Sequence, residues 1–316
     1  MMKKINDIIG DAKTIGIAGH VRPDGDCMGS CMSLYNYLKK NRPDLDVRVF
    51  LEFVDKKFNI IENTDQIITT GYDGTKFDLF ISLDTASLDR LGLNLPFYEN
   101  AKRTACIDHH ASNDGYADYN YILPKASSAS EVLYDLLDED LIDKSIAEPM
   151  YMGIAHDSGV FRFQSTTPKT MRIAANMIEK GVNVNMILEE TFFRKTYNQM
   201  MVTAKIQSEA VLALDGKCIY GYCTSEMMEE YGVTTKDLDA VVASIRNVDG
   251  VEVAMFLYQL SENSYKVSLR SKNYVDVSKI AVENGGGGHV RAAGAEMHGE
   301  LNDIINKLLN RIKQDI

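Results

Sequence analysis

The sequence lacks the long apolar segments and the cysteine patterns that mark several classes of protein. It contains no run of about 18 uncharged apolar residues, so no transmembrane helix is predicted. The five cysteines are odd in number and include no CxxC pair, which argues against a disulfide framework and a structural zinc site. The first residues reach acidic side chains before any apolar run of signal-peptide length. We therefore expect a soluble protein of the reducing cytoplasm, without a membrane partner.

Positive charge is also scarce. The chain has 34 Lys and Arg residues against 45 Asp and Glu residues, which gives a net charge of −11. Such a charge repels a long polyanion unless metal ions or a local basic pocket reverse it, so long duplex nucleic acid is disfavoured as a partner. The composition is otherwise that of a globular protein, and a length of 316 residues favours two domains over a one-domain barrel.

Short apolar runs alternate with longer helical patterns in the first part of the chain, an order that is typical of a parallel sheet with covering helices. The candidate strands are Thr14–Ala18, Val47–Leu51, Phe77–Leu83 and Thr104–Ile107. Helices are predicted over Ser30–Lys40, from a capping box at Ser128 and Glu131 through Leu137, and from an N-cap at Thr167 through Lys180.

The pattern stays helical and rich in methionine from Asn185 to Ala213, and strand-like runs then return at Lys217–Tyr222, Val251–Leu260 and Tyr265–Leu269. We therefore predict an α/β protein of two domains. The predicted boundaries are an N-terminal parallel-sheet domain over residues 1–190, a helical linker over 191–212 and a smaller C-terminal α/β domain over 213–316.

The first candidate strand leads into a loop that concentrates side chains able to bind a metal ion. The segment GHVRPDGDCMGS contains His20, Asp24 and Asp26. A tight loop with Pro and Gly can turn an imidazole and two carboxylates to the same side. The alternative is a polar loop in which the Asp residues only cap the following helix.

Three further segments repeat this arrangement. Asp84 follows the strand Phe77–Leu83, and Asp108, His109 and His110 follow the strand at Thr104. Asp157 follows an apolar helical run. Each could be an isolated turn or loop residue. Because ligands bind at the carboxyl edge of open α/β sheets, the repetition favours one shared site.

The number and type of these groups indicate a chemistry. Carboxylates and imidazoles without a thiolate favour Mn²⁺, with Mg²⁺, Co²⁺ or Fe²⁺ as alternatives. Six ligands exceed the needs of one open catalytic ion and suit two ions that share a carboxylate: His20, Asp24, Asp26, Asp84, His109 and Asp157. Two such ions stabilise an in-line phosphoryl displacement and activate water. The sequence thus indicates metal-assisted hydrolysis of a phosphoester or phosphoanhydride.

The second predicted domain carries a run of four glycines, Gly285–Gly288, followed by His289. Consecutive glycines let backbone N–H groups approach an anion, although a flexible hinge is the alternative. No Lys-Ser/Thr pair follows, so this is not a Walker A loop. Arg270 and Ser271, at the end of a predicted strand, add a fork-shaped donor suited to phosphate.

In combination, these segments resemble the motifs of the DHH/DHHA1 phosphoesterases, in the family's order and over nearly the whole chain. The segments are GHVRPDGDCMGS, DTAS, IDHH, AHDSG and GGGGHVRAAG. The most similar branch of this RecJ-like superfamily is that of the stand-alone nanoRNases and 3′-phosphoadenosine-5′-phosphate (pAp) phosphatases. Cys27 departs from the pattern, since a small apolar residue is expected there, but no ligand is lost.

The resemblance implies roles for the matching positions. One Mn²⁺ would be held by His20, Asp24 and Asp84, and the second by Asp26, Asp84, His109 and Asp157, so that Asp84 bridges the two ions. Asp108 would orient the motif, and His110 would face the scissile phosphate. A terminal phosphate or nucleotide would be bound in the second domain by Arg270, Ser271, Gly287, Gly288 and His289.

The implied activity is hydrolysis of short 5′-phosphorylated oligonucleotides, such as nanoRNA, pApA or pGpG, and of pAp. A manganese-dependent inorganic pyrophosphatase is the nearest alternative, but its basic Ser-Arg-Lys-Lys-type run is absent. A non-catalytic nucleotide sensor is disfavoured because all six ligand positions are filled. A RecJ-like exonuclease for long single strands is disfavoured by the net charge and the absence of an appended nucleic-acid domain. The preferred substrate stays open, as does the oligomeric state, for which a homodimer is one option.

Overall fold

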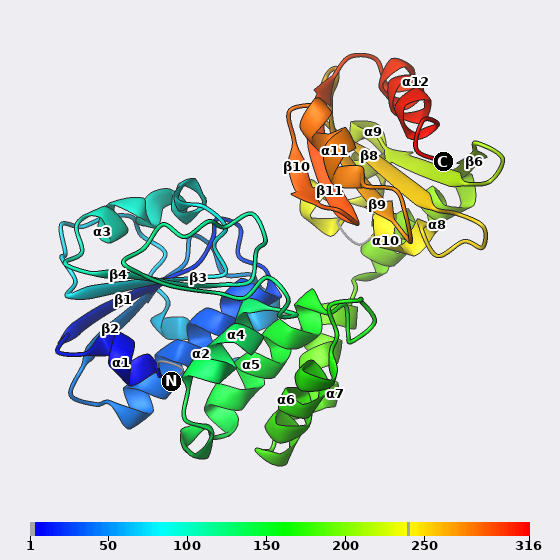
Figure 1. The fold of residues 1–316 in the computed structure, drawn as a ribbon. Helices are drawn as coiled ribbons and strands as arrows, with labels where there is room; N and C mark the ends of the chain where they lie inside the picture. The colour runs from blue at the N-terminus through cyan, green and yellow to red at the C-terminus, as the bar shows by residue number, and fades with distance from the viewer. Residues whose placement is uncertain (1–3, 239–240) are drawn as a thin grey trace. The chain divides into compact units, whose positions relative to one another are not determined.

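A computed structural model of the chain describes residues 4–238 and 241–316. The chain divides into two compact units, residues 1–194 and residues 195–316 (Figure 1). The segment 191–212, predicted as a linker, therefore contains the end of the first unit and the first helix of the second, α8 (Tyr197–Glu209).

The first unit is built on a parallel sheet with the strand order β2-β1-β3-β4-β5. Its strands are β1 (Thr14–Ala18), β2 (Asp46–Phe50), β3 (Leu79–Leu83), β4 (Thr104–Asp108) and β5 (Tyr119–Ile122). Every residue of β3 and β4 is buried. Strands covered on both faces need apolar side chains on both, which is why they appear in the sequence as unbroken apolar runs.

Helices cover both faces of this sheet (Figure 1). One face packs against α2 (Gly25–Asn41), α4 (Ala129–Leu136) and α5 (Lys144–Asp157) through a core that includes Ile15, Ile17 and Ile81. The other face lies under α3 (Leu95–Glu99), where the rings of Phe50, Phe80 and Phe97 cluster. The unit also contains α1 (Ile5–Ile9), α6 (Pro168–Glu179), α7 (Val184–Leu188), the π-helix η5 (Glu189–Phe193), and the 3₁₀ segments η1 (Lys56–Phe58), η2 (Thr64–Gln66), η3 (Leu88–Asn94) and η4 (Glu139–Leu141).

Two glycines allow α2 and α5 to approach closely. A Cβ on Gly29 would lie 2.5 Å from the Pro149 carbonyl oxygen and 2.9 Å from the Cα of Gly153. A Cβ on Gly153 would lie 2.1 Å from Ser130 Oγ. The first turn of α2 is thereby held against α5 and the start of α4.

The second unit is a mixed sheet with the strand order β10-β11-β9-β8-β7-β6, in which only β7 and β8 pair in parallel among the described strands. The strands are β6 (Val211–Ala213), β7 (Cys218–Cys223), β8 (Val253–Ser261), β9 (Ser264–Ser271), β10 (Gly287–His289) and β11 (Ala292–His298). One face packs on α11 (Val277–Glu283) and α12 (Leu301–Ile312). The other packs on α8, α9 (Ser225–Tyr231) and α10 (Val241–Ile245), and a 3₁₀ turn, η6 (Thr235–Asp237), precedes α10.

The predicted fold class is confirmed: the chain is a two-domain α/β protein with a parallel sheet in its N-terminal part. The seven predicted strands correspond to β1, β2, β3, β4, β7, β8 and β9, with ends displaced by at most two residues. Among the described residues, no helix is long and apolar enough to cross a membrane. The five cysteines are all free and buried.

Two predicted helices are present, but the start of one and the capping of the other differ from the prediction. The helix predicted from Ser30 begins at Gly25, because the Asp24 carboxylate caps it by accepting hydrogen bonds from the N–H groups of Asp26 and Cys27. Ser128 caps α4, but the Glu131 carboxylate does not complete the capping box, since it accepts hydrogen bonds from Ser127 and Thr170 instead.

The predicted helical stretch from Asn185 to Ala213 is not continuous. It is divided into α7, η5 and α8, and its last three residues form strand β6. Thr196 interrupts it by capping α8, because its side chain accepts a hydrogen bond from the Gln199 N–H. A threonine in this position satisfies an otherwise unpaired donor of the new helix, which the methionine-rich pattern does not reveal.

Candidate active site

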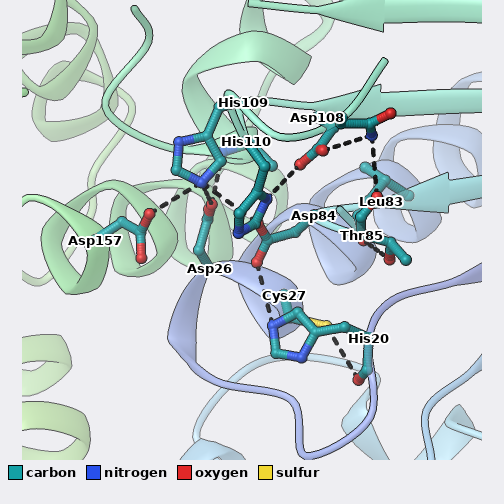
Figure 2. A network of polar contacts seen from close by, with 12 residues as sticks. His20, Asp26, Cys27, Leu83, Asp84, Thr85, Asp108, His109, His110 and Asp157 are labelled. Carbon is teal, nitrogen blue, oxygen red and sulfur yellow. Dashed lines mark hydrogen bonds and ion pairs between the residues drawn. The ribbon is translucent and has the colours of Figure 1, made fainter. Parts of the chain in front are cut away.

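The predicted metal ligands of the first unit gather at the carboxyl edge of its sheet (Figure 2). His20 follows β1, Asp84 follows β3, and His109 and His110 follow β4. Asp157 is the last residue of α5, whereas Asp24 is the N-cap of α2 and Asp26 lies in its first turn. Strand ends and helix ends are rigid supports, so these side chains are held in place before any ligand binds.

His109 lies at the centre of one half of the cluster. Its Nε2 is 3.1 Å from Asp157 Oδ2, 3.4 Å from Asp84 Oδ1 and 4.0 Å from Asp26 Oδ2. Figure 2 shows the three carboxylates facing this nitrogen from different elements. Two ligands about 2.1 Å from an octahedral ion and at right angles to each other are about 3 Å apart. The spacing therefore suits a divalent ion.

Asp84 joins the two halves of the cluster. Its Oδ1 faces His109, and its Oδ2 is 3.5 Å from Nε2 of His20. The backbone of Asp84 has a φ of 52°, an uncommon conformation for a residue other than glycine, which here turns the carboxylate back over the sheet edge. Oδ1 is buried without a hydrogen-bond partner among the described residues. A buried carboxylate oxygen without a hydrogen-bond partner needs another partner, and a bound cation would provide one.

Asp26 is fixed by the start of α4. Its Oδ2 accepts a hydrogen bond of 2.6 Å from the Ala129 N–H, and its Oδ1 accepts one of 3.0 Å from the Ser130 N–H. The first N–H groups of a helix lack partners within the helix and favour a negative charge. This fully buried carboxylate is therefore oriented by a segment more than a hundred residues away in the sequence.

Asp24 has two functions in the structure. It caps α2 through Oδ1, and the same oxygen lies 3.8 Å from Nε2 of His20. Asp24 can therefore cap the helix, as the alternative interpretation of this loop expects, and also lie beside His20 as a proposed ligand. Since a carboxylate has two oxygens with about four acceptor positions, one residue can serve both purposes.

The ionisation of these groups reflects their crowding. Burial alone lowers the pKa of His109, but the carboxylates of Asp157 and Asp84 outweigh it and raise the pKa to about 12. Burial also lowers the pKa of His20, but Cys27, Asp24 and Asp84 outweigh it and raise the pKa to about 12. Burial raises the pKa of Asp26 and of Asp157, whereas the two imidazoles lower that of Asp84 despite its burial. Four carboxylates this close together cannot all be ionised without cations.

Among the described residues, three groups of side chains have ligand atoms close enough to hold an ion. They are His20, Asp24 and Asp84; Asp26, His109 and Asp157; and Asp84, His109 and His110. The donor set, of carboxylates and imidazoles only, suits Mn²⁺ and similar divalent ions. The first two groups together contain all six residues predicted as ligands, and Asp84 lies between them.

His110 belongs to the third group, but its ring is held by a different partner. Nδ1 is 2.8 Å from Asp108 Oδ1 and 3.7 Å from Asp84 Oδ1. Asp108 is fully buried, and its Oδ2 accepts a hydrogen bond of 2.7 Å from the Asn113 side chain. Burial alone would raise the pKa of Asp108, but the hydrogen bond with His110 lowers it. The ionised carboxylate therefore accepts a hydrogen bond from Nδ1, and Asp108 orients the ring of His110.

In the second unit, the sheet register groups two of the predicted substrate-binding residues. His289 of β10 pairs with Ala292 of β11, which pairs with Arg270 of β9. Directly paired residues of an antiparallel sheet point to the same face, so His289 and Arg270 share a face about 10 Å apart, with a small alanine between them. Ser271 is buried beside Arg270.

The second half of the glycine run, Gly287 and Gly288, lies in strand β10, whereas Gly285 is in the turn after α11 and Gly286 precedes the strand. A Cβ on Gly288 would lie 2.5 Å from the Ala292 carbonyl oxygen, whereas Gly287 has open space around its Cα. Gly288 is therefore required for β10 to approach β11. Arg291 lies beside the run, and its guanidinium donates hydrogen bonds to the carbonyl oxygens of Val275 and Asn273 in the same unit.

Sequence reasoning missed several residues that support the site. Asn113 and the N–H groups at the start of α4 orient Asp108 and Asp26, and a guanidinium nitrogen of Arg90 lies 3.2 Å from His20 Nδ1. His156 directly precedes Asp157 in α5. Its Nε2 lies 2.9 Å from Thr191 Oγ1, and burial lowers its pKa to about 4. None of these contacts has a local sequence signal, because each joins segments distant in the chain or uses a residue type common in loops.

Comparison with known proteins gives matches over both units. Residues 14–154 match the DHH family, N-terminal domain, and residues 215–315 match the DHHA1 domain. Over 313 residues the chain is 31% identical to the bifunctional oligoribonuclease and PAP phosphatase NrnA of Thermus thermophilus, covering 96% of this chain and 90% of that protein. The protein of the same name from Bacillus subtilis is 27% identical, with 90% of each chain covered.

Among solved structures, an exopolyphosphatase-related protein from Bacteroides fragilis has a similar fold. The TM-score is 0.89 at 23% sequence identity, and the match covers 98% of this chain and 95% of the other. At this identity the likeness concerns the fold alone. The two-unit architecture is thus found in an experimentally determined structure over nearly the full length.

Proposed function

Because the chain belongs to the DHH family, whose members are metal-dependent phosphoesterases, we propose that it hydrolyses short 5′-phosphorylated oligonucleotides and pAp. The observation that carries this proposal is the cluster around Asp84, in which all six predicted ligands lie in two adjoining groups. The names of the relatives in Thermus thermophilus and Bacillus subtilis, oligoribonuclease and PAP phosphatase, support the choice of substrates.

Two Mn²⁺ ions fit the donor set best. His20, Asp24 and Asp84 would hold one, and Asp26, Asp84, His109 and Asp157 the other. When bound, such ions polarise the phosphoryl oxygens and lower the pKa of water. The chain's own contribution is to fix the ligands: α4 orients Asp26, the turn at Asp84 directs both of its oxygens into the cluster, and Asp157 faces His109.

His110 and Asp108 supply the remaining groups. With Nδ1 committed to Asp108, Nε2 is the nitrogen of the His110 ring that is left to meet an oxygen of the scissile phosphate. The Asp108 carboxylate orients that ring, and Asn113 holds the carboxylate. We therefore assign His110 to the phosphate and Asp108 to its orientation.

In the second unit, Arg270, Ser271, Gly287, Gly288 and His289 are proposed to bind a terminal phosphate or nucleotide. Support comes from the register, which puts Arg270 and His289 on one face with only Ala292 between them. A guanidinium and an imidazole separated by a small residue leave room for an anion between their donor groups. A homodimer and a cytoplasmic location complete the proposal.

A panel of substrates tests the proposed function. The purified protein, loaded with Mn²⁺, is assayed with pApA, pGpG, pAp, cyclic di-AMP, pyrophosphate and a 24-nucleotide RNA. We expect turnover of the linear dinucleotides and of pAp, and loss of all turnover after chelation. Selective hydrolysis of pyrophosphate would support the pyrophosphatase alternative instead. Binding of nucleotides without turnover of any member of the panel would support the sensor.

A further inference from the structure

Arg90 lies beside the proposed metal centre and is not one of its predicted ligands. It belongs to η3, which follows Asp84, and a nitrogen of its guanidinium is 3.2 Å from Nδ1 of His20. Its side chain is exposed, whereas the imidazole that it approaches is buried. The guanidinium therefore stands at the solvent side of the His20 ring.

The contact with His20 does not account for the position of Arg90. Nδ1 of His20 is 2.8 Å from the carbonyl oxygen of Val21, a group that only accepts, so Nδ1 carries the proton. A guanidinium is also only a donor. Two donors do not form a hydrogen bond, so the ring is oriented by Val21 and does not need Arg90. The tautomer with a proton on Nδ1 also leaves Nε2 able to bind an ion, on the side of Asp24 and Asp84.

The backbone nevertheless fixes Arg90 where it is. Its carbonyl oxygen accepts a hydrogen bond of 2.7 Å from the Val21 N–H, which ties η3 to the loop after β1. Gly92 permits this approach, since its φ is 52° and a Cβ there would lie 2.4 Å from a methyl carbon of Val21. The arginine is thus carried on a braced segment directly at the cluster.

Arg90 also differs from other arginines of the first unit in its ion pairing. Three of them form ion pairs with aspartates: Arg42 with Asp44, Arg48 with Asp46, and Arg103 with Asp11. Within the part of the chain that the structure describes, no carboxylate lies within 4.0 Å of the Arg90 guanidinium. A cation held at an acidic cluster without an acid partner of its own is available for an anionic ligand.

The charge balance of the proposed metal centre favours an additional cation beside a bound phosphate. The four carboxylates of Asp24, Asp26, Asp84 and Asp157 are neutralised by two divalent ions, as the proposed function requires. A phosphate that enters this centre adds negative charge that the ions do not balance. A guanidinium at the rim can offset it with two parallel N–H donors.

From these observations we propose that Arg90 binds the scissile phosphate of the substrate, at the end of the metal centre formed by His20, Asp24 and Asp84. This inference rests on the proposed function and extends it by a substrate-binding residue from the first unit. It concerns any phosphate monoester or diester that reaches the centre, irrespective of the base.

The test compares Arg90→Gln with Arg172→Gln, which removes an exposed arginine of α6. Affinity for Mn²⁺ is measured by calorimetry, and affinity for AMP, which is a product and is not turned over, is measured on the Mn²⁺-loaded proteins. For Arg90→Gln we expect AMP binding and kcat/KM for pAp to fall 10- to 100-fold. The Mn²⁺ affinity should be unchanged or higher, because a positive charge beside the ion has been removed. Arg90→Lys should recover part of the loss, and Arg172→Gln should behave as the unmodified protein.

Two results would overturn the proposal. Weaker Mn²⁺ binding in Arg90→Gln would make Arg90 a positioning residue for His20, and unchanged AMP binding would exclude contact with phosphate. Failure of the proposed function is recognised separately. If no substrate of the panel is hydrolysed while Arg90→Gln still loses AMP binding, the assignment of Arg90 stands and the phosphoesterase activity does not.

Discussion

Asp84 carries the largest share of the proposed metal chemistry. It is the only residue common to both predicted ligand sets, and its two oxygens face His109 and His20. Asp84→Ala should therefore lower kcat/KM by well over 100-fold, which is more than the loss expected from groups that only orient ligands. Metal analysis should show the loss of both ions. Asp89→Ala, which removes a nearby exposed carboxylate, is the control. Near-normal rates with Asp84→Ala would show that this residue does not bridge two ions.

His110 should behave differently from the ligands. Because its Nδ1 is committed to Asp108, His110→Ala should lower kcat about 100- to 10,000-fold, the range for a positioned proton donor, and leave the metal content intact. The measurement is metal analysis beside steady-state kinetics. If the variant loses one bound ion, His110 is a ligand, as the group of Asp84, His109 and His110 would allow.

Metal uptake should release protons. In the protein without metal, burial lowers the pKa of both imidazoles, but their neighbours outweigh it and raise the pKa of each to about 12. These neighbours are Cys27, Asp24 and Asp84 for His20, and Asp157 and Asp84 for His109, so both rings are protonated at pH 7. An imidazole must lose a proton to bind an ion, so Mn²⁺ affinity should rise as the pH rises from 6 to 8. Calorimetric titration at pH 7 in two buffers with different ionisation enthalpies measures the protons released. Identical enthalpies in the two buffers would contradict this prediction.

The six proposed ligands could be picked out in the sequence because each comes directly after an apolar run or at a helix end. The residues that orient them could not. Asn113 lies in an ordinary polar loop, and the N–H groups that hold Asp26 are backbone atoms, which have no residue type of their own. Gly288 was predicted as part of an anion-binding loop, and its close contact with Ala292 becomes visible only when β10 is paired with β11.

Helices α2 and α5 connect the packing of the first unit to its chemistry. A Cβ on Gly153 would lie 2.6 Å from Asp26 Oδ1, so a side chain at this position displaces a proposed ligand. Gly153→Ala should destabilise the protein by about 1 to 3 kcal/mol, the usual cost of overpacking. It should also weaken metal binding. Urea denaturation gives the free energy of unfolding, and calorimetry gives the metal affinity.

Gly71→Ala is the matched control, since a Cβ there would meet only ordinary contacts at 3.7 Å or more. Gly29→Ala separates the two effects, because its Cβ would clash with α5 and not with Asp26. We expect Gly29→Ala to lose stability while retaining more of its metal affinity than Gly153→Ala. If Gly153→Ala were as stable as Gly71→Ala, the close approach of the two helices would be wrong.

Elements with strong periodicity were predicted well, and those that depend on partners were not. The buried strands β1, β3 and β4 appear as apolar runs in the sequence. β5, β10 and β11 were not predicted: β5 is only partly buried, and β10 is exposed and nearly all glycine. Such strands are formed by pairing with a neighbouring strand, so their own residues carry little signal.

The two-domain architecture could be predicted from length and from the return of strand patterns after a helical stretch. The function could not be reached from the fold, because α/β folds support many activities. It depended on a small number of acidic and histidine residues at known places in the chain. Arg270 and His289 are a further case: they are far apart in the sequence, and only the register of β9, β10 and β11 brings them to one face.

The net charge of −11 leads to a prediction about substrate length. A long RNA gains affinity from each phosphate that meets a basic side chain, and loses it where the protein is acidic. If binding is confined to Arg90 and to the group around Arg270 and His289, nucleotides beyond the first few add repulsion and little attraction. We therefore expect kcat/KM to be at least about 10-fold higher for oligonucleotides of two to five residues than for a 24-mer. The rates must be compared at one salt concentration and counted per chain end. Equal kcat/KM for a dinucleotide and a 24-mer would mean that additional phosphates are bound productively, and the activity would then be that of an exonuclease for long single strands.

The contribution of the second unit is tested by Arg270→Ala. This variant should lower kcat/KM about 10- to 150-fold on the short substrates, as expected for a lost charge-assisted hydrogen bond. It should leave the metal content unchanged.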